Sequence, residues 1–484
     1  MISVKGCVVD RADAEAIHEA GKEAVIITLS QQCERIKKLE KRVTSLRQDS
    51  TNSSKPPSSD GPGTKKKTKK RKSRKKQGGQ PNHKGKKRNL LPTEQMDKVH
   101  DCYPDQCEEC SNHFADDQKK PTDKPARYQW FELPVIKMIM EEFRCHTLTC
   151  RCGHRTTASL PKYVAISCFG PRLHAAIAYL NVEHRVAKRG ITEIVKNFFN
   201  IDMALGSTCN IAYRVSEACQ PVAEKIRSYV ANTFNLNIDE TGWKNKAKRI
   251  YLWSFVGTLC VFFHIDNSRG SKVLKKILGP LFDGIIGSDD YSAYSAYHKK
   301  GKRQLCWAHL IRKLKALKEN RGSPDSYIFS KNMLKETGRL FTYWHAYLET
   351  DGCSLEQLYQ ATTLTRARMK KYCKQYCDSD DNAVRTRARR TLKNWPHLFT
   401  FLQVEGVEPT NNRAEQSFRH AVMWRKICFG SQSKKGERYV ARTLSVTRSC
   451  KMQGRNPFVF LSELMEATFK GQSSPEILPN VLSN

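Results

Sequence analysis

Hydrophobic and polar residues alternate without interruption over residues 234–239 (FNLNID), just ahead of the sequence ETGW. A period of two is typical of a strand with one buried face, so the polar side chains, the last of which is Asp239, share the opposite face. Glu240 would return to the apolar face if the strand continued. We therefore expect the strand to end at Asp239 and Glu240 to lie in a turn. A lone aspartate there is most often only a turn or cap residue, so a functional role for Asp239 requires partners.

The pattern downstream predicts three further strands and a helix. The runs 249–255 and 258–265 predict a hairpin, and a helix is expected to open within residues 268–271. The short apolar run 284–286 then leads into the adjacent acids Asp289 and Asp290. The expected order is strand, strand, strand, helix, strand, with carboxylates after the first and the last of these strands.

Residues 1–50 are predicted to form a helical segment with a coiled-coil seam. Apolar residues recur there at intervals of three and four, which is the heptad signature over about three heptads. The seam positions are Val25, Leu29, Gln32, Ile36, Leu39, Val43 and Leu46. The alternative is an amphipathic helix that packs on its own chain.

Helical periodicity returns after residue 165. Residues 166–232 are predicted to be a helical DNA-binding domain, because residues 191–219 contain a helix, a short turn and a second helix opening at Ser207 or Thr208, as in a helix-turn-helix. A plain helical bundle is the alternative. Residues 301–400 are predicted to be a helical insertion, in which His309, at a helix start, contacts DNA or a leaving group or is structural.

Residues 401–450 contain a further amphipathic helix, and residues 451–484 form the C-terminal segment. Glu415 lies in the first turn of this helix, whose apolar face includes Ala414 and Phe418. The alternative for Glu415 is a capping box with Asn412 as N-cap.

Charge points to a polyanionic partner. The formal net charge is +36, and removing the 14 lysines and arginines of residues 65–88 leaves +22, so the excess is spread over the chain. Nucleic acid is the favoured partner, with an anionic membrane surface as the alternative. Residues 51–98 are predicted to be a disordered basic linker on DNA, the alternatives being a solubilising or nuclear-targeting run. Its expected DNA contacts include Lys65, Lys66, Lys67, Arg71 and Arg74.

The hydropathy pattern predicts a protein of the cytoplasm. The longest apolar stretch, residues 250–265, is broken by Gly257-Thr258 into two strand-sized halves, so no membrane-spanning helix is expected. The first residues lack a signal-peptide pattern.

Six of the 18 cysteines fall between Cys102 and Cys152 and predict a zinc-binding domain at residues 99–165. Four thiolates that converge from two turns form a tetrahedral structural zinc site. The two close pairs, separated by a strand-like stretch around residues 128–140, are Cys107 with Cys110 and Cys150 with Cys152. Ordinary reduced thiols are the alternative.

Asp239, Asp289 and Glu415 are the candidate metal ligands of a catalytic site. A two-metal phosphoryl-transfer site needs several carboxylates to hold cations about 3.5 to 4 Å apart. Basic residues on the Glu415 helix would offset the charge of an approaching phosphate. These are Arg413, Arg419, Arg425 and Lys426.

Several segments resemble the transposases of the insertion sequence 66 family. They are NSSKPPSSD, GGQPNHKG, NIDETGW, GSDDYSAY, CWAHLIRKL and PTNNRAEQSFRHAVMWRKICFGSQSKKGERYVARTLSVTRSC, in that order. The resemblance implies a multidomain α/β protein with an RNase H-like mixed-sheet core, residues 233–300 and 401–450, in which the three acids bind Mg2+ (or Mn2+), two ions in all. The spacing before SAY favours Asp289 over Asp290 as the second acid, although Asp290 itself departs from the family pattern.

The resemblance implies a DNA transposase that cleaves the ends of its element and joins the freed 3′-hydroxyl to target DNA. The implied partners are double-stranded DNA of the terminal inverted repeats and of the target, further copies of the chain, and possible accessory proteins of the same element. The expected location is the nucleoid of a prokaryotic cytoplasm. The alternatives are a related nuclease or junction resolvase without strand transfer, and a DNA-binding regulator whose core is inactive.

Overall fold

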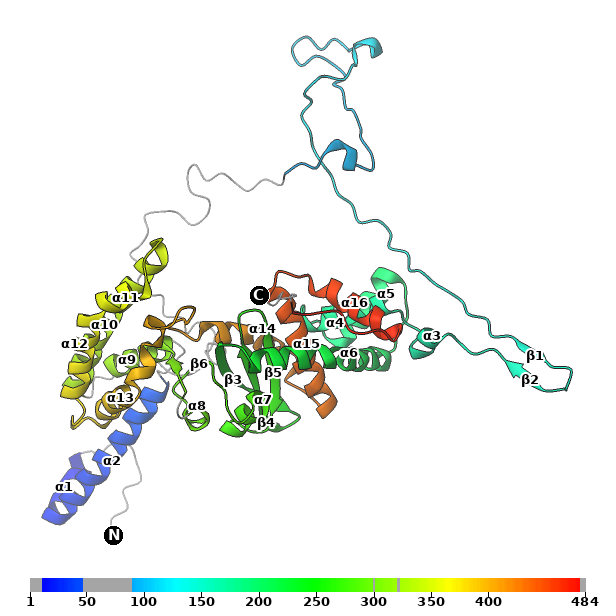
Figure 1. Cartoon of the computed structure of the whole chain (residues 1–484). Coiled ribbons are helices and arrows are strands. Elements are labelled where there is room, and N and C mark those ends of the chain that lie inside the picture. Colours follow the sequence, from blue (N-terminus) through cyan, green and yellow to red (C-terminus); the bar gives the residue numbers. More distant parts are fainter. Residues whose placement is uncertain (1–10, 47–88, 299–300, 320–322, 479–484) are drawn as a thin grey trace. The chain divides into compact units, whose positions relative to one another are not determined.

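The computed structural model describes residues 11–46, 89–298, 301–319 and 323–478 of a mixed α/β protein (Figure 1). The chain divides into two units, residues 65–140 and the remainder. No helix in the described part of the chain is long and apolar enough to cross a membrane.

The N-terminal segment contains α1 (Arg11–Glu19) and α2 (Lys22–Leu46). The predicted helix is confirmed, and its seam faces outward, since the exposed fractions of Leu29, Ile36 and Leu39 are 61%, 54% and 53%. Pairing with a second helix stays a prediction. Most of the predicted linker, including Lys65, Lys66, Lys67, Arg71 and Arg74, lies outside the described residues.

The predicted zinc-binding region contains little regular structure. It has two short 3-10 helices, η2 (Thr93–Gln95) and η3 (Asp116–Gln118), and an isolated bridge between Gln106 and His113. The strand expected around residues 128–140 is wrong: Pro134 interrupts the run, and large apolar side chains such as Trp130 are exposed. A short hairpin, β1 (Thr147–Thr149) and β2 (Arg155–Thr157), follows in the other unit.

Four helices lie between β2 and β3. They are α3 (Lys162–Ile166), α4 (Pro171–Val182), α5 (Lys188–Phe199) and α6 (Leu205–Ala231). The predicted sequence of helix, short turn and helix is confirmed, although α6 opens slightly earlier than expected. Asn200 ends α5 in the left-handed conformation that a C-terminal cap uses. The buried face of α6, which includes Ile211 and Val222, packs into the main hydrophobic core.

The central sheet has five strands in the order β5-β4-β3-β6-β7. Their bounds are β3 (Asn235–Asn245), β4 (Lys248–Val256), β5 (Val261–Asp266), β6 (Ile285–Ser288) and β7 (Arg303–Leu305). With α7 (Ser271–Leu278) between β5 and β6, the expected order of strand, strand, strand, helix, strand is confirmed. β4 runs antiparallel to both its neighbours, whereas β3, β6 and β7 are parallel. Because β7 belongs to the sheet, the helices of the insertion start after it rather than at residue 301.

The predicted end of the first strand is wrong. β3 continues past Asp239 because Thr241–Asn245 pair with β4 in a tight hairpin that turns at Lys246, where φ is +53°. On the other side, β6 pairs only with residues 235–237 of β3. Asp239 therefore lies inside a strand, at the point where its neighbour β6 ends.

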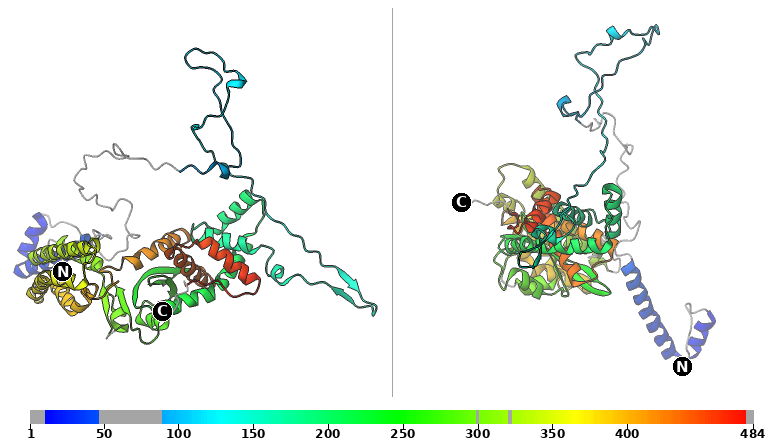
Figure 2. Two further views of the ribbon diagram at one scale, coloured as in Figure 1. Left: turned by 45° about the horizontal axis from the view of Figure 1, so that its top comes forward. Right: turned by 90° about the vertical axis from the view of Figure 1, so that its right-hand side faces the viewer.

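Helices cover both faces of the sheet (Figures 1 and 2). On one face, Leu236 and Ile238 of β3 share a core with α6, α7 and Tyr294 of α8 (Ser292–Tyr297). On the other, Trp243 of β3 shares a core with α14 (Asn412–Cys428) and α15 (Lys434–Met452). The last helix, α16 (Pro457–Phe469), packs against α4. Strand parity thus assigns even-numbered residues of β3 to the α7 side and odd-numbered residues to the α14 side.

The segment predicted to be a helical insertion is helical and has a core of its own. Its helices are α9 (Trp307–Glu319), α10 (Pro324–Glu349), α11 (Leu355–Ala361), α12 (Thr363–Gln375) and α13 (Asn382–Lys393), followed by the 3-10 helices η4 (Trp395–Leu398) and η5 (Thr400–Leu402). Ile285 of β6 and Leu305 of β7 belong to this core, so the insertion packs on the β6–β7 edge of the sheet.

Candidate active site

The register of the two central strands brings Asp239 and Asp289 side by side. Asn235 pairs with Ile285, and Asn237 pairs with Gly287. Two residues further along the parallel strands, Asp239 and Asp289 occupy matching positions. Since side chains alternate along a strand, the carboxylate of Asp239 points to the α14 side of the sheet, and Asp289 follows directly after the end of β6.

Asn411 fixes the start of α14 against the same strand. Its Nδ2 donates to the carbonyl of Ile238 (2.8 Å), and its Oδ1 accepts from Nδ2 of Asn237 (3.0 Å). A Cβ at Gly287 would lie 2.5 Å from Nδ2 of Asn237, so the glycine leaves room for that amide. The first turn of α14, which carries Glu415, is thereby held on the face that bears Asp239.

The capping-box alternative for Glu415 is wrong. The N-cap is Asn411 rather than Asn412, and its side chain hydrogen-bonds to β3 instead of capping the helix. The Glu415 Oε1 lies 3.2 Å from Nη2 of Arg312 and 3.4 Å from Nδ1 of His309, both on α9. Glu415 is therefore turned toward the space between the sheet and the insertion.

Burial and the neighbouring acids raise the pKa of Asp239. The pKa of Asp239 lies well above its usual range, first because the carboxyl is buried and then because Glu240, Asp289 and Glu415 are close. Burial also raises the pKa of Asp289, although the Tyr291 N–H donates to its Oδ1 at 2.9 Å. Clustered carboxylates disfavour their own ionisation unless a cation offsets the charge. Carboxylate oxygens are the donors that Mg2+ prefers, so the three acids have the donor chemistry that such an ion requires.

A second set of possible ligands adjoins Glu415. In the described ranges, the group of Cys306, His309 and Glu415 has ligand atoms within 4.8 Å of one another. Burial raises the pKa of the Cys306 thiol to about 11 and lowers the pKa of His309 to about 3. The cation that pairs with Glu415 is Arg312, at 3.2 Å. The Nδ1 atom of His309 is buried and has no hydrogen-bond partner among the described residues, so the role of His309 stays a prediction.

Asp290 points away from the other acids, into the helical insertion. Its Oδ2 lies 3.2 Å from Nη2 of Arg390, 3.8 Å from Nζ of Lys313 and 3.9 Å from Nη1 of Arg387. Its Oδ1 is 3.4 Å from Nδ2 of Asn394. The structure separates the two adjacent acids, with Asp289 beside Asp239 and Asp290 beside α9 and α13.

Glu240 is the residue of this site that the sequence analysis misplaced. It is buried on the α7 side, where Oε1 accepts from Nε of Arg269 at 2.7 Å and Oε2 accepts from the hydroxyl of Tyr294. Burial, together with Asp289, raises its pKa to about 7. Arg269 also covers the ring of Tyr291 at 4.2 Å. Through Arg269, Glu240 thus stabilises the loop that carries Asp289. The alternation of the strand could have predicted a buried position for Glu240, because this residue shares the apolar face.

The basic residues of α14 divide into two pairs. Nη2 of Arg413 donates to the carbonyl of Gly257 at 3.1 Å, and Arg425 donates to the carbonyl of Gly242. Arg419 and Lys426 are exposed. Arg413 and Arg425 therefore hold α14 against the sheet. Arg419 and Lys426 do not make these packing contacts and are available to bind a phosphate.

Each of the two cysteine pairs occupies a tight turn. Cys107 N–H donates to Asn112 at 2.9 Å, and backbone N–H groups of Cys110 and Glu109 lower the pKa of Cys107. In the β1–β2 hairpin, Cys150 N–H donates to His154 at 2.8 Å, and the backbone N–H of Cys152 lowers the pKa of Cys150. Backbone donors that stabilise a thiolate favour metal binding. That the two pairs share one zinc stays a prediction.

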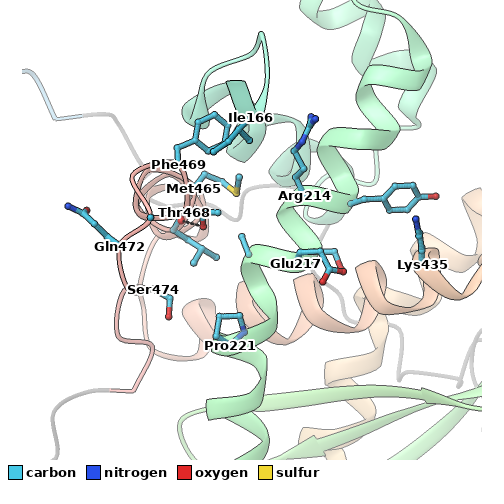
Figure 3. Close-up of a pocket in the computed structure, with 15 residues that line it drawn as sticks. Ile166, Arg214, Glu217, Pro221, Lys435, Met465, Thr468, Phe469, Gln472 and Ser474 are labelled. Atoms are coloured by element: carbon cyan, nitrogen blue, oxygen red, sulfur yellow. Dashed lines mark hydrogen bonds between the residues drawn. The ribbon is translucent and has the colours of Figure 1, made fainter. Parts of the chain in front are cut away.

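A cavity of about 740 Å3 lies elsewhere in the fold, among α6, α15 and α16. Figure 3 shows apolar side chains such as Phe469 on one side and Arg214, Glu217 and Lys435 on the other. None of the acids described above lines it. The candidate active site lies instead where β6 ends beside β3.

Comparison with known proteins agrees with this geometry. A family model described as "Transposase IS66 family" matches residues 167–439, more than half of the chain, and a family of unknown function matches residues 11–89. The curated relatives are themselves named uncharacterized proteins, from Sinorhizobium fredii (strain NBRC 101917 / NGR234).

One of these relatives, y4jD, is 22% identical over 53% of this chain and 49% of its own length. Another, y4hP, is 22% identical over 68% of this chain and 64% of its own length. The chain thus spans about half to two thirds of the relatives it matches. The family match covers the sheet, the insertion and all three candidate acids, and the chain belongs to the IS66 transposase family.

Proposed function

We propose that this protein is a DNA transposase that cleaves a phosphodiester at each end of an insertion sequence and joins the freed 3′-hydroxyl to target DNA. Asp239, Asp289 and Glu415 are the ligands of two Mg2+ or Mn2+ ions. The observation that carries the proposal is the matching register of β3 and β6, which sets Asp239 beside Asp289, and the proposal is supported by the effect of Glu415 on the pKa of Asp239.

The sheet order supports an RNase H-like core. Counted along the chain, the first strand lies at the centre, the second and third flank it on one side, and the fourth and fifth flank it on the other. Only the second strand runs in the direction opposite to the other four. Ligands of open α/β sheets bind at the point where the strand order reverses, which here is between β3 and β6.

The chain's own residues would bind, orient and balance charge. The metal ions supply the activation of the attacking oxygen and the stabilisation of the leaving oxygen. Asn411 and Glu240 hold the acids in position, while arginine and lysine side chains neutralise the phosphates that must approach these carboxylates.

A cleavage and joining assay tests the proposal. The substrate is a labelled duplex carrying the terminal inverted repeat found beside the gene, incubated with target DNA and Mg2+. Cleavage followed by joined product is expected. Cleavage without joining would make the protein a nuclease or resolvase, and binding alone would make it a regulator.

The basic linker is proposed to supply much of the sequence-independent affinity for DNA, which would hold the protein on the nucleoid. Replacing residues 65–88 with a glycine-serine segment of equal length should lower the slope of log affinity against log salt by about 0.9 for each phosphate no longer neutralised. Preference for the element end should persist. A variant that lost the preference and kept the slope would contradict this assignment, and fluorescence anisotropy at several salt concentrations measures both.

The exposed seam of α2 is proposed to pair with α2 of a second copy. Ile36→Asp together with Leu39→Asp places charges in the seam and should convert a dimer to a monomer in sedimentation analysis, because charges are excluded from a and d positions. Lys38→Asp, on the outer face of the same helix, is the control and should stay dimeric. If the seam variant remained dimeric, α2 would not be the interface.

A further inference from the structure

The charges around Asp290 do not balance. Three cations, Lys313, Arg387 and Arg390, approach the one carboxylate, and only Arg390 comes within hydrogen-bonding distance, at 3.2 Å. Arg303 adds a fourth charge nearby: only 6% of it is exposed, and its Nε has no hydrogen-bond partner among the described residues. A half-buried group of cations that outnumbers the carboxylates beside it attracts a further anion.

The sequence of α13 directs these cations to one place. Arg387 and Arg390 are three residues apart and so share a face of the helix. Arg389 points elsewhere, where its Nη2 lies 2.7 Å from Oδ1 of Asp378. Burial, and the charge of Arg390, lower the pKa of Arg387, while Asp290 raises it. α13 thus carries a cationic face toward Asp290 and a separate, paired arginine.

The cluster adjoins the candidate catalytic acids. Asp290 follows Asp289 directly, and Lys313 acts electrostatically on both carboxylates. The pocket between Asp290 and helices α9 and α13 has a volume of about 30 Å3, which is about the volume that one water molecule occupies in the liquid. A larger anion therefore has to lie against the open side of the cluster, where 47% of the Arg390 side chain is exposed.

We propose that Lys313, Arg387 and Arg390 form a clamp for a DNA backbone phosphate next to the scissile one, with Asp290 holding the two arginines apart and in place. The helical insertion then takes part in substrate binding instead of serving as a spacer. Arginine is suited to this role because its planar fork binds phosphate oxygens in pairs. The clamp also offsets the repulsion between DNA and the catalytic carboxylates.

The clamp rests on the proposed function, so its test measures binding without chemistry. The full chain is titrated into the terminal-repeat duplex in EDTA, at several salt concentrations. Arg390→Ala should weaken binding by roughly tenfold and lower the salt slope by about 0.9, the loss of one phosphate contact. Arg389→Ala removes the same charge from the same helix and should leave both quantities near those of the wild type.

Asp290→Asn should act in the opposite direction. It removes the competing negative charge and keeps the side-chain size, so DNA binding should tighten by several fold. If it weakened binding, Asp290 would not be the counter-charge of a phosphate site. Circular dichroism and thermal melting show whether each variant is folded.

Neutral phosphate analogues locate the contact. Methylphosphonates are placed one at a time around the cleavage position, and each should weaken binding by the wild type. At the phosphate that Arg390 contacts, a methylphosphonate should weaken binding by the wild type but not by Arg390→Ala. The reason is that the variant has already lost this contact, so the two changes are not additive. Additive losses at every position, or equal effects of Arg390→Ala and Arg389→Ala, would overturn the clamp. A wild type that binds in this way but never cleaves would overturn the proposed function and leave the clamp standing.

Discussion

Alanine at Asp239, Asp289 or Glu415 is expected to abolish DNA cleavage and joining while leaving DNA binding intact. Each substitution removes a proposed metal ligand, and a metal ion contributes several kcal/mol of transition-state stabilisation. At about 1.4 kcal/mol for each factor of ten, activity should fall by roughly a thousandfold or more. Binding rests on lysine and arginine contacts to phosphates, so the three variants should still shift end DNA in a gel.

Two aspartates near Asp289 serve as comparisons. Asp290→Ala should keep activity within about tenfold of the wild type, because Asp290 contacts Arg390 and its neighbours instead of the other acids. Asp283, an exposed acid in the loop before β6, is the matched control, and Asp283→Ala should not change activity. An inactive Asp290→Ala beside an active Asp289→Ala would exchange the roles of the two residues. Loss of activity in both would mean that Asp290 also shapes the metal site.

Strand parity explains why the first acid could be predicted from sequence. The alternation over residues 234–239 assigns Asp239 to the polar face whatever follows, and the structure confirms that face. The end of the strand could not be predicted in the same way. The letters ETG are typical of a turn, but the hydrogen bonds that extend β3 come from β4, and pairing between strands is not encoded in local propensity.

The roles of the charged residues depended even more on distant partners. Local sequence could not choose between Asp289 and Asp290, and what separates them is the register of β3 with β6 on one side and the arginines of α13, a hundred residues away, on the other. Arg413 and Arg425 were grouped with the DNA contacts because they lie on the Glu415 helix. Their carbonyl partners, on the turn after β4 and in β3, become visible only when α14 packs on the sheet.

Glu240 was predicted to lie in a turn, although the alternation of the strand places it on the apolar face. Its position in the alternation predicts a side chain among apolar residues, which is unfavourable for a carboxylate without partners. Treating it as a turn residue avoided that conflict. The chain resolves the conflict differently, by supplying Arg269 and Tyr294 as partners inside the core. A buried acid next to a candidate ligand is therefore a signal of a supporting role.

Zinc is expected at about one ion per chain, held by Cys107, Cys110, Cys150 and Cys152. The region between the pairs has few strands and many exposed apolar side chains, so a metal would supply much of its folding free energy. For zinc sites in small domains this amounts to about 10 to 16 kcal/mol at neutral pH. Removing the ion should make residues 99–165 sensitive to protease and leave the sheet and the insertion folded.

The test is metal analysis of the purified full chain and of matched cysteine variants. Cys107→Ser combined with Cys150→Ser removes one thiolate from each turn, which leaves too few ligands for tetrahedral coordination, and the zinc content should fall about tenfold or more. Cys168→Ser, an exposed thiol outside both turns, should keep the wild-type content. Cys145→Ser tests whether this further cysteine is a ligand in place of one of the proposed four. Loss of zinc in that variant would assign one ligand position to Cys145. A wild type without zinc, or zinc that survives the double substitution, would contradict the site. In that case the lowered pKa values of Cys107 and Cys150 would describe only two turns rich in backbone donors.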